Sequence, residues 1–512
     1  MPFNAVFSHI IKKRLPRIER FSDKPIVCQK ENINFLLNTA AQTVFGKEYD
    51  FQSCDSIRRF QNTVPLSNYD SLKPYIDRQI KGEENILWPG KTSWFAKSSG
   101  TTTKREKLLP ITVDALYENH YAGGKDLLAL YYQNFQNRKL YNAKHLIIGG
   151  STQIHSMSND TSIGDLSAFI VENLPWWTEI RRTPKREIAL MNDWEEKLEK
   201  MAHATLNENI CIIAGLPSWT ILLMKKILEI SGKENIHEVW PNLELYIHGG
   251  MNFSPYKESF KALFPNPHMN YVEAYNSSEG YFGLQDQVES QDLLLLVDSH
   301  IFYEFIPMSD FDGLNSKIVL SLDQVELEKE YAIVISTSAG LWRYIIGDTI
   351  KFSQNRPYRF QITGRTSQFI NSFGEKLLVI HAEKAISRAA QCCNAKIKDY
   401  TVAPFFKSES QNGGHEWAIA FDVVPSDMKK FNHILDQSLM DLNVDYEGKR
   451  RNSINMIEPK IKIIDHDIFE KWLKSRNKLG GQHKIPRLNE DRTFIEEIVE
   501  LNLKSDRNSY IY

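Results

Sequence analysis

The chain has 512 residues, of which 42% are hydrophobic, 25% charged and 11% aromatic, and this composition excludes disordered, collagen-like and coiled-coil proteins. Sixty-two basic residues against 64 acidic ones give a formal charge of −2, so neither a basic surface for nucleic acid nor an acidic tail is indicated. The five cysteines are sparse and lack CxxC spacing, which argues against a disulfide framework or a zinc site.

The N-terminal 60 residues are predicted to be helical. Residues 1–21 lack the apolar core of a signal peptide, and no apolar run approaches the roughly 20 residues of a membrane span. We therefore expect a soluble, cytoplasmic monomer that binds neither membrane nor nucleic acid. A short strand is predicted at Trp94–Ala96, and Thr112 is expected to cap an amphipathic helix over residues 113–135.

Strands that alternate with helices occupy the middle of the chain. A helix is predicted over residues 218–230, and strands are predicted at 145–148, 211–214, 243–248 and 271–275. Strands followed by helices indicate a parallel or mixed sheet that is covered on its faces.

From residue 302 onward the strands are closely spaced, with few helices between them. They are predicted at 302–306, 325–327, 331–337, 342–346 and 358–362, and after residue 365 helices and strands are mixed. The expected fold is therefore α/β. A large N-terminal domain, residues 1–365, has mixed or parallel sheets covered by helices plus a β-rich subdomain, and a smaller α+β domain follows over residues 366–512.

The strongest chemical signal is the segment 97–107, with the sequence Lys-Ser-Ser-Gly-Thr-Thr-Thr-Lys-Arg-Glu-Lys, directly after a strand. Glycine lets the backbone approach an anion, and hydroxyl and N–H groups can surround phosphate oxygens. The GxxxxGK[ST] spacing is absent, so this is not a Walker A loop. From composition alone, a polar surface loop is an equally consistent interpretation.

Two further segments place an acidic residue at a predicted strand end. Residues 275–280, Tyr-Asn-Ser-Ser-Glu-Gly, contain Glu279, a hard oxygen ligand suited to Mg²⁺. Residues 343–348, Arg-Tyr-Ile-Ile-Gly-Asp, end at Asp348, which could accept two hydrogen bonds from a ribose diol. Taken alone, each is also consistent with an ordinary turn.

Glycines mark two later segments that suit a hinge and a mobile loop. Residues 363–366 have the sequence Thr-Gly-Arg-Thr, and residues 480–487 have the sequence Gly-Gly-Gln-His-Lys-Ile-Pro-Arg. Lys484 in the second could carry a positive charge into a distant site. As a bare pattern, this second segment is more typical of a surface loop.

The order of these segments resembles the adenylate-forming superfamily of acyl-CoA synthetases, adenylation domains and luciferases. The closer resemblance is to the Gretchen Hagen family of acyl-acid amido synthetases. It extends from about residue 90 to 490 and is carried by Ser98-Ser99-Gly100-Thr101-Thr102 through Lys107, by Tyr275-Asn276-Ser277-Ser278-Glu279, and by Gly340-Leu341-Trp342-Arg343-Tyr344-Ile345-Ile346-Gly347-Asp348.

This resemblance implies a site for ATP and Mg²⁺, with a role for each matching residue. The phosphate loop would comprise Ser98, Ser99, Gly100, Thr101 and Thr102. The adenine would be lined by Gly249, Gly250, Tyr275 and Asn276. Ser278 would contact the α-phosphate, Glu279 would hold Mg²⁺, and Asp348 would bind the ribose hydroxyls. Arg365 would lie at the interdomain hinge, and Lys484 of a small domain that rotates over the active site would reach the acyl-phosphate.

The resemblance also implies the reaction, with a carboxylic acid and an amino acid as the substrates. The acid would be adenylated with release of pyrophosphate, and the amino acid would then displace AMP to form an amide. Two alternatives remain open: transfer of the same adenylate to coenzyme A, and nucleotide binding without turnover. The second would suit two departures from the family pattern, Lys104 in place of a second glycine and Thr366 in place of a charged hinge residue.

The sequence does not identify the acid or the amino acid. Trp176, Trp177 and Trp219 could line an apolar substrate pocket, although packing in the core is the favoured interpretation.

Overall fold

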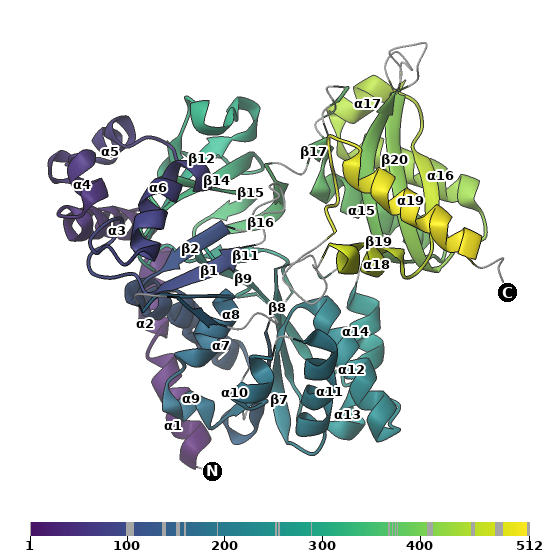
Figure 1. Ribbon diagram of the computed structural model, residues 1–512, viewed down its shortest axis with the longest axis horizontal. Helices are drawn as coiled ribbons and strands as arrows, with labels where there is room; N and C mark the ends of the chain where they lie inside the picture. Colours follow the sequence, from purple (N-terminus) through teal and green to yellow (C-terminus); the bar gives the residue numbers. More distant parts are fainter. Residues whose placement is uncertain are drawn as a thin grey trace. The chain divides into compact units, whose positions relative to one another are not determined.

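The structure is a computed structural model that describes residues 2–98, 107–135, 140–149, 154–157, 160–191, 193–250, 253, 256–287, 289–366, 369–370, 372–373, 375, 377–406, 413–451, 456–476 and 485–508. The described residues form two compact units (Figure 1). The first comprises those of 1–100, 105–346 and 350–361, and the second those of 347–349 and 362–512. Because strand β16, Tyr358–Arg365, contributes to both, the domain boundary at residue 365 stays a prediction.

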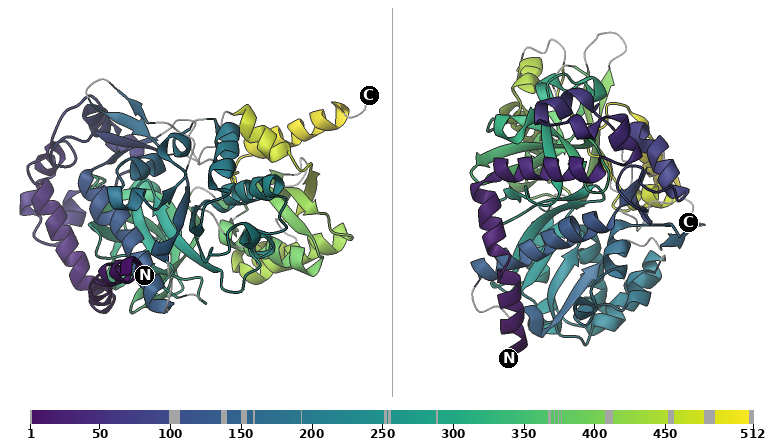
Figure 2. Two further views of the ribbon diagram at one scale, coloured as in Figure 1. Left: turned by 90° about the horizontal axis from the view of Figure 1, so that it is seen from below. Right: turned by 90° about the vertical axis from the view of Figure 1, so that its left-hand side faces the viewer.

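Helices form the N-terminal part of the first unit, which confirms the sequence prediction. They are α1 Pro2–Lys12, α2 Leu15–Asp23, α3 Pro25–Ala40, α4 Val44–Glu48, α5 Ile57–Thr63 and α6 Tyr69–Ile80. Side chains fix several starts: Thr43 caps α4, Ser56 caps α5, and Asn68 forms a capping box with Ser71 on α6. Figure 2 shows the purple helices along one side of this unit.

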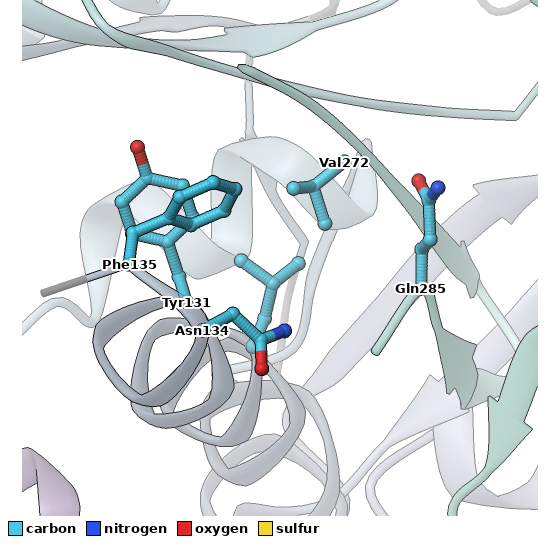
Figure 3. A pocket seen from close by; sticks show the side chains of 6 residues that line it. Tyr131, Asn134, Phe135, Val272 and Gln285 are labelled. Atoms are coloured by element: carbon cyan, nitrogen blue, oxygen red, sulfur yellow. The ribbon is translucent and has the colours of Figure 1, made fainter. Parts of the chain in front are cut away.

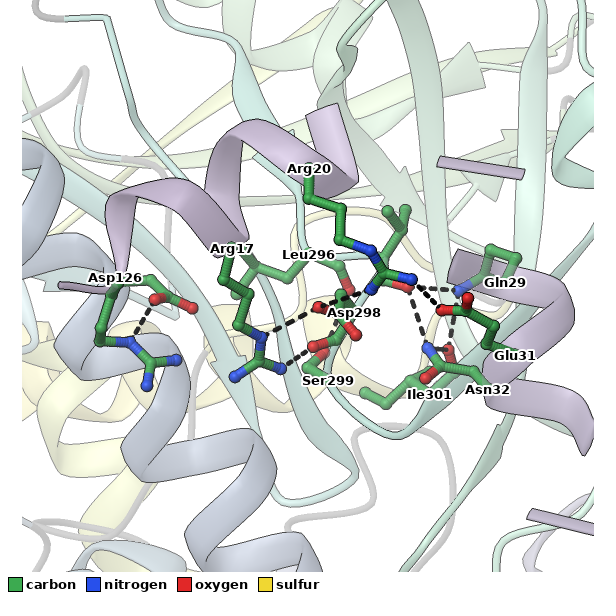
Figure 4. Close-up of polar contacts among 12 residues, drawn as sticks. Arg17, Arg20, Gln29, Glu31, Asn32, Asp126, Leu296, Asp298, Ser299 and Ile301 are labelled. Carbon is green, nitrogen blue, oxygen red and sulfur yellow. Dashed lines mark hydrogen bonds and ion pairs between the residues drawn. The ribbon is translucent and has the colours of Figure 1, made fainter. Parts of the chain in front are cut away.

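Charged and amide side chains of α2 and α3 join these helices to the rest of the first unit (Figure 4). The ion pairs are Arg14 with Asp126, Arg17 with Asp298, and Arg20 with Glu31. Gln29 and Asn32 each donate to the carbonyl oxygens of Val297 and Ile301, over 2.9–3.1 Å. Helix α3 is therefore held by buried hydrogen bonds, and α2 by ion pairs that are partly exposed.

A twelve-stranded mixed sheet forms the centre of the first unit, in the order β13-β12-β14-β15-β16-β11-β10-β9-β8-β7-β3-β6. Its parallel part comprises β3 Lys144–Ile148, β6 Arg182–Thr183, β7 Ile210–Gly215, β8 Leu245–Gly249 and β9 Asn270–Ser277. The other strands are β10 Gly280–Leu284, β11 Leu293–Leu295, β12 Ile301–Pro307, β13 Leu320–Ser321, β14 Glu330–Thr337, β15 Tyr344–Asn355 and β16. The predicted mixed sheet with a β-rich region after residue 300 is confirmed.

One predicted strand, Val325–Leu327, is wrong. This segment follows a 3-10 turn at Leu322–Gln324 and leads into a turn where Glu328 has φ +62°. Glu326 and Leu327 are exposed and Val325 is only half-buried, so the segment Val-Glu-Leu has no buried face that would favour pairing in the sheet.

Helices cover the parallel part of the sheet, as Figure 1 shows for α11–α14 beside β7 and β8. The helices are α9 Trp176–Glu179, α10 Arg186–Ala189, α11 Trp194–Thr205, α12 Pro217–Ser231, α13 Ile236–Val239 and α14 Lys257–Leu263, whereas α8 Leu166–Glu172 packs against strand β1, Trp94–Ser98. Ile213 and Tyr246 of the sheet pack with Leu223 of α12 and Phe260 of α14 in one fully buried cluster. Each such apolar side chain contributes about 1.5–3 kcal/mol by leaving water.

The helix expected over residues 113–135 is present, but its form differs from the prediction. Thr112 caps it through its hydroxyl, which accepts from the Ala115 N–H over 3.0 Å. The first turns are a π-helix, Ala115–His120, and α7 follows over Tyr121–Asn134. The helix is not amphipathic, because α7 packs against both the N-terminal helices and the sheet and is buried on most of its surface.

A second, four-stranded sheet in the first unit has the order β2-β1-β5-β4. Its strands are β1 Trp94–Ser98, β2 Lys107–Ile111, β4 His155–Ser156 and β5 Ser162–Gly164. Strands β1 and β2 are antiparallel neighbours, and Phe95, Ala96 and Leu109 are buried in them. The predicted strand at Trp94–Ala96 is confirmed.

The second unit is an α+β domain with helices on both faces of a three-stranded sheet. Its elements are β17 Phe369–Ile370, β18 Leu377–Leu378, α15 Val379–Cys392, β19 Lys396–Phe406, β20 Gly413–Val423, α16 Met428–Leu442, α17 Val444–Arg451, β21 Lys460–Ile464, α18 Ile468–Ser475 and α19 Thr493–Asn508. Trp417 and Ile419 pack against α15 and α16, whereas Ala418 and Ala420 pack against α18 and α19. This alternation is the period of two of a strand buried on both faces.

Among the helices that the structure describes, none combines the length and hydropathy needed to cross a bilayer.

Candidate functional site

The two strands that flank the predicted phosphate loop are well defined. Ser98 ends β1 and pairs with Lys107, which begins β2. The Leu108 N–H donates to the Tyr69 hydroxyl over 3.0 Å, which ties β2 to helix α6. Ser99, Gly100, Thr101 and Thr102 lie outside the described residues. The structure therefore fixes where the loop begins and ends, in an antiparallel hairpin of the smaller sheet.

A tight hairpin presents Glu279. Ser277 of β9 pairs with Gly280 of β10, so Ser278 and Glu279 form a two-residue turn between them. The Ser277 hydroxyl donates to a Glu279 carboxylate oxygen over 2.8 Å and accepts from the Glu279 N–H over 3.2 Å. Ser278 is 7% exposed. The carboxylate is thus oriented by its own turn at the end of a central strand.

The strand before this turn holds the next two predicted residues. The Tyr275 ring is buried, with its centroid 5.0 Å from that of Phe282. The Asn276 Oδ1 atom lies 2.9 Å from the Nδ1 atom of His120. Sequence analysis did not single out His120, and no local pattern marks it, because it lies 156 residues from its partner.

The glycine pair at the end of β8 lies beside this hairpin. Gly249 pairs with Ala274 across the parallel strands, and a Cβ on Gly249 would overlap the Ala274 carbonyl oxygen. Gly250 follows with φ +73°, a conformation that favours glycine. Gly250, Tyr275 and Asn276 therefore come together at the carboxyl ends of two adjacent parallel strands, the edge where α/β sheets bind ligands.

Asp348 and Arg365 are brought together on neighbouring strands. The Arg365 Nε atom is 2.8 Å from an Asp348 carboxylate oxygen, and the two side chains are 32% and 18% exposed. Asp348 was expected in a turn at the end of a strand 342–346, but it lies inside β15, which continues to Asn355. Gly347 makes this continuation possible with φ +89°, and its carbonyl oxygen accepts from the Thr366 N–H over 2.7 Å.

Arg343, just before β15, has a structural role that the sequence did not indicate. Its guanidinium forms a buried pair with Glu304, with N–O distances of 3.0–3.2 Å, and donates to the carbonyl oxygens of Gln61 and Val64. Its backbone has φ +43° and its N–H donates to the Ser336 hydroxyl. The segment before Asp348 therefore anchors strand β15 to the N-terminal helices.

Lys484 lies outside the described residues, but the segment that follows it is fixed to β19. The Thr401 hydroxyl donates to the Pro486 carbonyl oxygen over 2.7 Å, and the Val402 N–H donates to that of Arg487 over 2.9 Å. The Arg487 guanidinium lies 4.5 Å from the centre of the Tyr400 ring and pairs with Asp399.

Metal-ligating side chains are not clustered in the part of the chain that the structure describes. No group of three or more His, Cys, Asp or Glu side chains there has the arrangement of a metal site. A metal that needs few protein ligands would suit Glu279. Mg²⁺ is such a metal, because it is commonly held by one or two carboxylates together with phosphate oxygens and water.

A small cavity between α7 and strands β9 and β10 is not a substrate pocket (Figure 3). Its volume is about 10 Å³, which is about the space of one water molecule. It is lined by Leu127, Tyr131, Asn134, Phe135, Val272 and Gln285. Trp219, considered as a pocket residue, packs in the core with its ring 5.0 Å from that of Trp194, and the side chains of Trp176 and Trp177 lie outside the description.

Comparison with known proteins covers almost the whole chain. Models of the GH3 (Gretchen Hagen) family match residues 14–269 as its N-terminal domain, 294–365 as its central domain and 380–493 as its C-terminal domain. An indole-3-acetic acid-amido synthetase GH3.4 of Arabidopsis thaliana is 23% identical and aligns with 93% of this chain and 91% of its own. A jasmonoyl–L-amino acid synthetase JAR4 of Nicotiana attenuata is 23% identical over 90% of each chain. A solved GH3.15 acyl acid amido synthetase superposes with a TM-score of 0.79 over 96% of each chain at 17% identity, so the fold is shared.

Proposed function

This chain belongs to the GH3 family, and we propose that it is an ATP-dependent acyl-acid amido synthetase. The observation that carries the proposal is the convergence of the Gly249–Gly250 turn and the Tyr275–Glu279 hairpin at one edge of the sheet. Of two relatives that align along most of both chains, one is named an indole-3-acetic acid-amido synthetase and the other a jasmonoyl–L-amino acid synthetase. An amide is therefore favoured over a thioester as the product.

The proposed reaction has two steps. A carboxylate oxygen of the acid attacks the α-phosphorus of ATP, the bond to the β-phosphate oxygen breaks, and pyrophosphate leaves. The amino acid nitrogen then attacks the carbonyl carbon of the acyl-adenylate, the bond to the phosphate oxygen breaks, and AMP leaves. The amine gives up its protons to solvent or to the departing phosphate, and we assign no residue as the base.

The first step joins two anions, so the site must offset negative charge. In the proposal, N–H groups of residues 98–102 surround the phosphates, and Lys484 adds a positive charge. Asp348 accepts from the ribose hydroxyls and is oriented by Arg365, whose guanidinium it contacts at 2.8 Å. Gly250, Tyr275 and Asn276 line the adenine, and Ser278 contacts the α-phosphate.

Mg²⁺ is part of the proposal, and the chemistry of Glu279 fits it. This side chain offers a hard carboxylate, held at the hairpin tip by Ser277. When bound, Mg²⁺ would neutralise charge on the phosphate oxygens. The ordering of the carboxylate by its turn lowers the conformational entropy that such a ligand would lose.

We also propose that residues 366–512 form a mobile domain whose movement brings Lys484 to the site for the first step. All five cysteines are free thiols, which supports the proposal of a reducing, cytoplasmic setting. The monomeric state is testable by light scattering on the purified chain.

The test is ATP–pyrophosphate exchange screened over a panel of carboxylic acids that includes aryl-acetic, benzoic and alkanoic acids. Exchange with some acids and none without acid is the expected result, since only an acid that is adenylated returns label to ATP. The active acid is then offered amino acids or coenzyme A, and mass spectrometry distinguishes amide from thioester. ATP binding without exchange for any acid would instead favour a nucleotide-binding protein without turnover.

A further inference from the structure

One short segment, Thr112–His120, is hydrogen-bonded to the β9–β10 hairpin of the proposed site and to the turn that precedes β15. The segment directly follows β2, the return strand of the phosphate-loop hairpin. Its first residue, Thr112, is buried, and its hydroxyl donates to the Ser338 carbonyl oxygen over 2.7 Å. Ser338 lies in the turn between β14 and β15, the strand on which Asp348 stands.

The end of the same segment holds the β9–β10 hairpin. Asn119 donates from its amide to the Tyr281 carbonyl oxygen over 3.0 Å and accepts from the Tyr281 N–H over 2.7 Å. Both partners are buried, and Gly123, one turn later, allows the Tyr281 ring to lie where a Cβ would be only 2.6 Å from it. The Asn119 side chain therefore pairs with the hairpin backbone in the way that another strand would.

His120 contacts the opposite strand of that hairpin at the same level. Asn276, whose Oδ1 atom lies 2.9 Å from His120 Nδ1, is the residue that pairs with Tyr281 across the two strands. Two consecutive helical residues, Asn119 and His120, are thus hydrogen-bonded to strands β10 and β9, next to the turn that carries Glu279. They lie in a π-helix, a rare form that is frequently found at functional sites and whose wider turn changes which successive side chains face one side.

We propose that His120 is a positioning residue that fixes the Asn276 side chain for the nucleotide, while Asn119 holds the backbone of the same hairpin. This inference rests on the proposed function, in which the Asn276 side chain lines the adenine of ATP. In the tautomer with the proton on Nδ1, the imidazole donates to the Asn276 carbonyl oxygen and leaves the Asn276 amide free to donate toward a ring nitrogen of the base. Loss of the imidazole would free the Asn276 side chain to rotate.

A purely structural role is the competing interpretation, because His120 is only 5% exposed. His145 provides a matched control for it. Burial lowers the pKa of both imidazoles to about 4, so both are neutral at pH 7, and each has a hydrogen bond of 2.9 Å. The partner of His145 is the Leu140 carbonyl oxygen, which no part of the proposed site uses.

The experiment measures the dissociation constant for MgATP by calorimetry on the full chain, without any acid, beside thermal unfolding of each variant. His120→Ala is expected to weaken MgATP binding about 3- to 10-fold, the effect of one lost hydrogen bond. His145→Ala should lose similar thermal stability but bind within twofold of wild type. His120→Gln, which restores a donor, should recover part of the affinity, and His120→Phe keeps the ring volume should the alanine variant not fold.

A double-mutant cycle with Asn276→Ala tests whether His120 acts through Asn276. The double variant should bind no more weakly than the weaker single variant, because both changes remove the same interaction. Wild-type affinity in His120→Ala and His120→Phe, or effects that multiply in the double variant, would overturn the inference while leaving the proposed function intact. Absence of MgATP binding by the wild-type chain would overturn both.

Discussion

Replacement of Glu304 by glutamine is expected to destabilise the first unit strongly. The Glu304 side chain is fully buried and that of Arg343 is 5% exposed, and the pair makes three N–O contacts of 3.0–3.2 Å. In Glu304→Gln the Arg343 guanidinium keeps its bonds to two backbone carbonyl oxygens but loses its counter-charge in a buried site. Breaking a buried pair in this way costs about 3–5 kcal/mol.

A matched change on the surface separates the effect of burial from the loss of a charge. Glu31 pairs with Arg20, and these side chains are 53% and 46% exposed (Figure 4). Glu31→Gln should therefore cost no more than about 1 kcal/mol, an amount that salt screens further. Since about 1.4 kcal/mol corresponds to a factor of ten, the two variants should differ by roughly 30-fold or more in the unfolding equilibrium constant.

The assay is urea unfolding at pH 7 followed by tryptophan fluorescence, to which the fully buried Trp342, the neighbour of Arg343 in the chain, contributes together with the other nine tryptophans. Glu304→Gln should lower the free energy of unfolding by at least about 2 kcal/mol more than Glu31→Gln does. This margin is the difference between a loss of about 3 kcal/mol for the buried pair and about 1 kcal/mol for the exposed pair. Equal losses in the two variants would refute this expectation. So would a loss in Glu304→Gln that 1 M salt abolishes, because a buried pair is screened little.

Three further outcomes are expected. Asp348→Ala should weaken MgATP binding about 10- to 100-fold by removing a charged acceptor for the ribose. The control is Asp441→Ala, which removes a surface partner of Arg388 and should leave MgATP binding unchanged. Equal affinities in these two variants would contradict the role assigned to Asp348. Glu279→Gln should slow pyrophosphate exchange, and raising the Mg²⁺ concentration should restore part of the rate; exchange that ignores Mg²⁺ in both proteins would reject this role. Burial raises the pKa of Glu273 to about 7, so the wild-type chain must hold a buried charge above that pH. The folded wild type is most stable below pH 4.5, the unfolded pKa, and loses stability as the pH rises through 7 and the buried carboxyl ionises. Glutamine does not ionise, so the free energy of unfolding of Glu273→Gln should rise by about 2–3 kcal/mol relative to that of the wild type between pH 4.5 and pH 8. A stability difference that does not change with pH would show that Glu273 does not titrate in this way.

The elements that could be predicted are those whose apolar pattern and ends are local. Strand β9 was predicted at residues 271–275 and is present in the structure, because its largely apolar segment stops near the serines of the hairpin turn. The prediction failed at Val325–Leu327, where the alternation of Val, Glu and Leu resembles a strand but Leu327 is exposed, as Glu326 is. It also ended the strand before Asp348 too early, because a glycine with positive φ can continue a strand as well as close one.

The residues that the sequence missed act through distant partners. His120 is 156 residues from Asn276, and Arg343 donates to backbone 279 and 282 residues away. Such contacts depend on how elements pack, and local patterns in a single sequence do not indicate which distant residues come into contact. The family resemblance identified motif residues in this chain, whereas the structure shows which buried side chains hold part of those motifs in place.

Helix α2 has a practical consequence for anyone who shortens this polypeptide. Its N-cap residue Arg14 is the ion-pair partner of Asp126 of helix α7, and burial of this carboxylate is the chief cause of its raised pKa. A version that began at Pro25 would lose this ion-pair partner together with helices α1 and α2, which pack against α7, and would expose to water the face of α7 that they cover. The opening two dozen residues are thus better treated as part of the folding unit than as a removable leader, and affinity tags should be added in front of them.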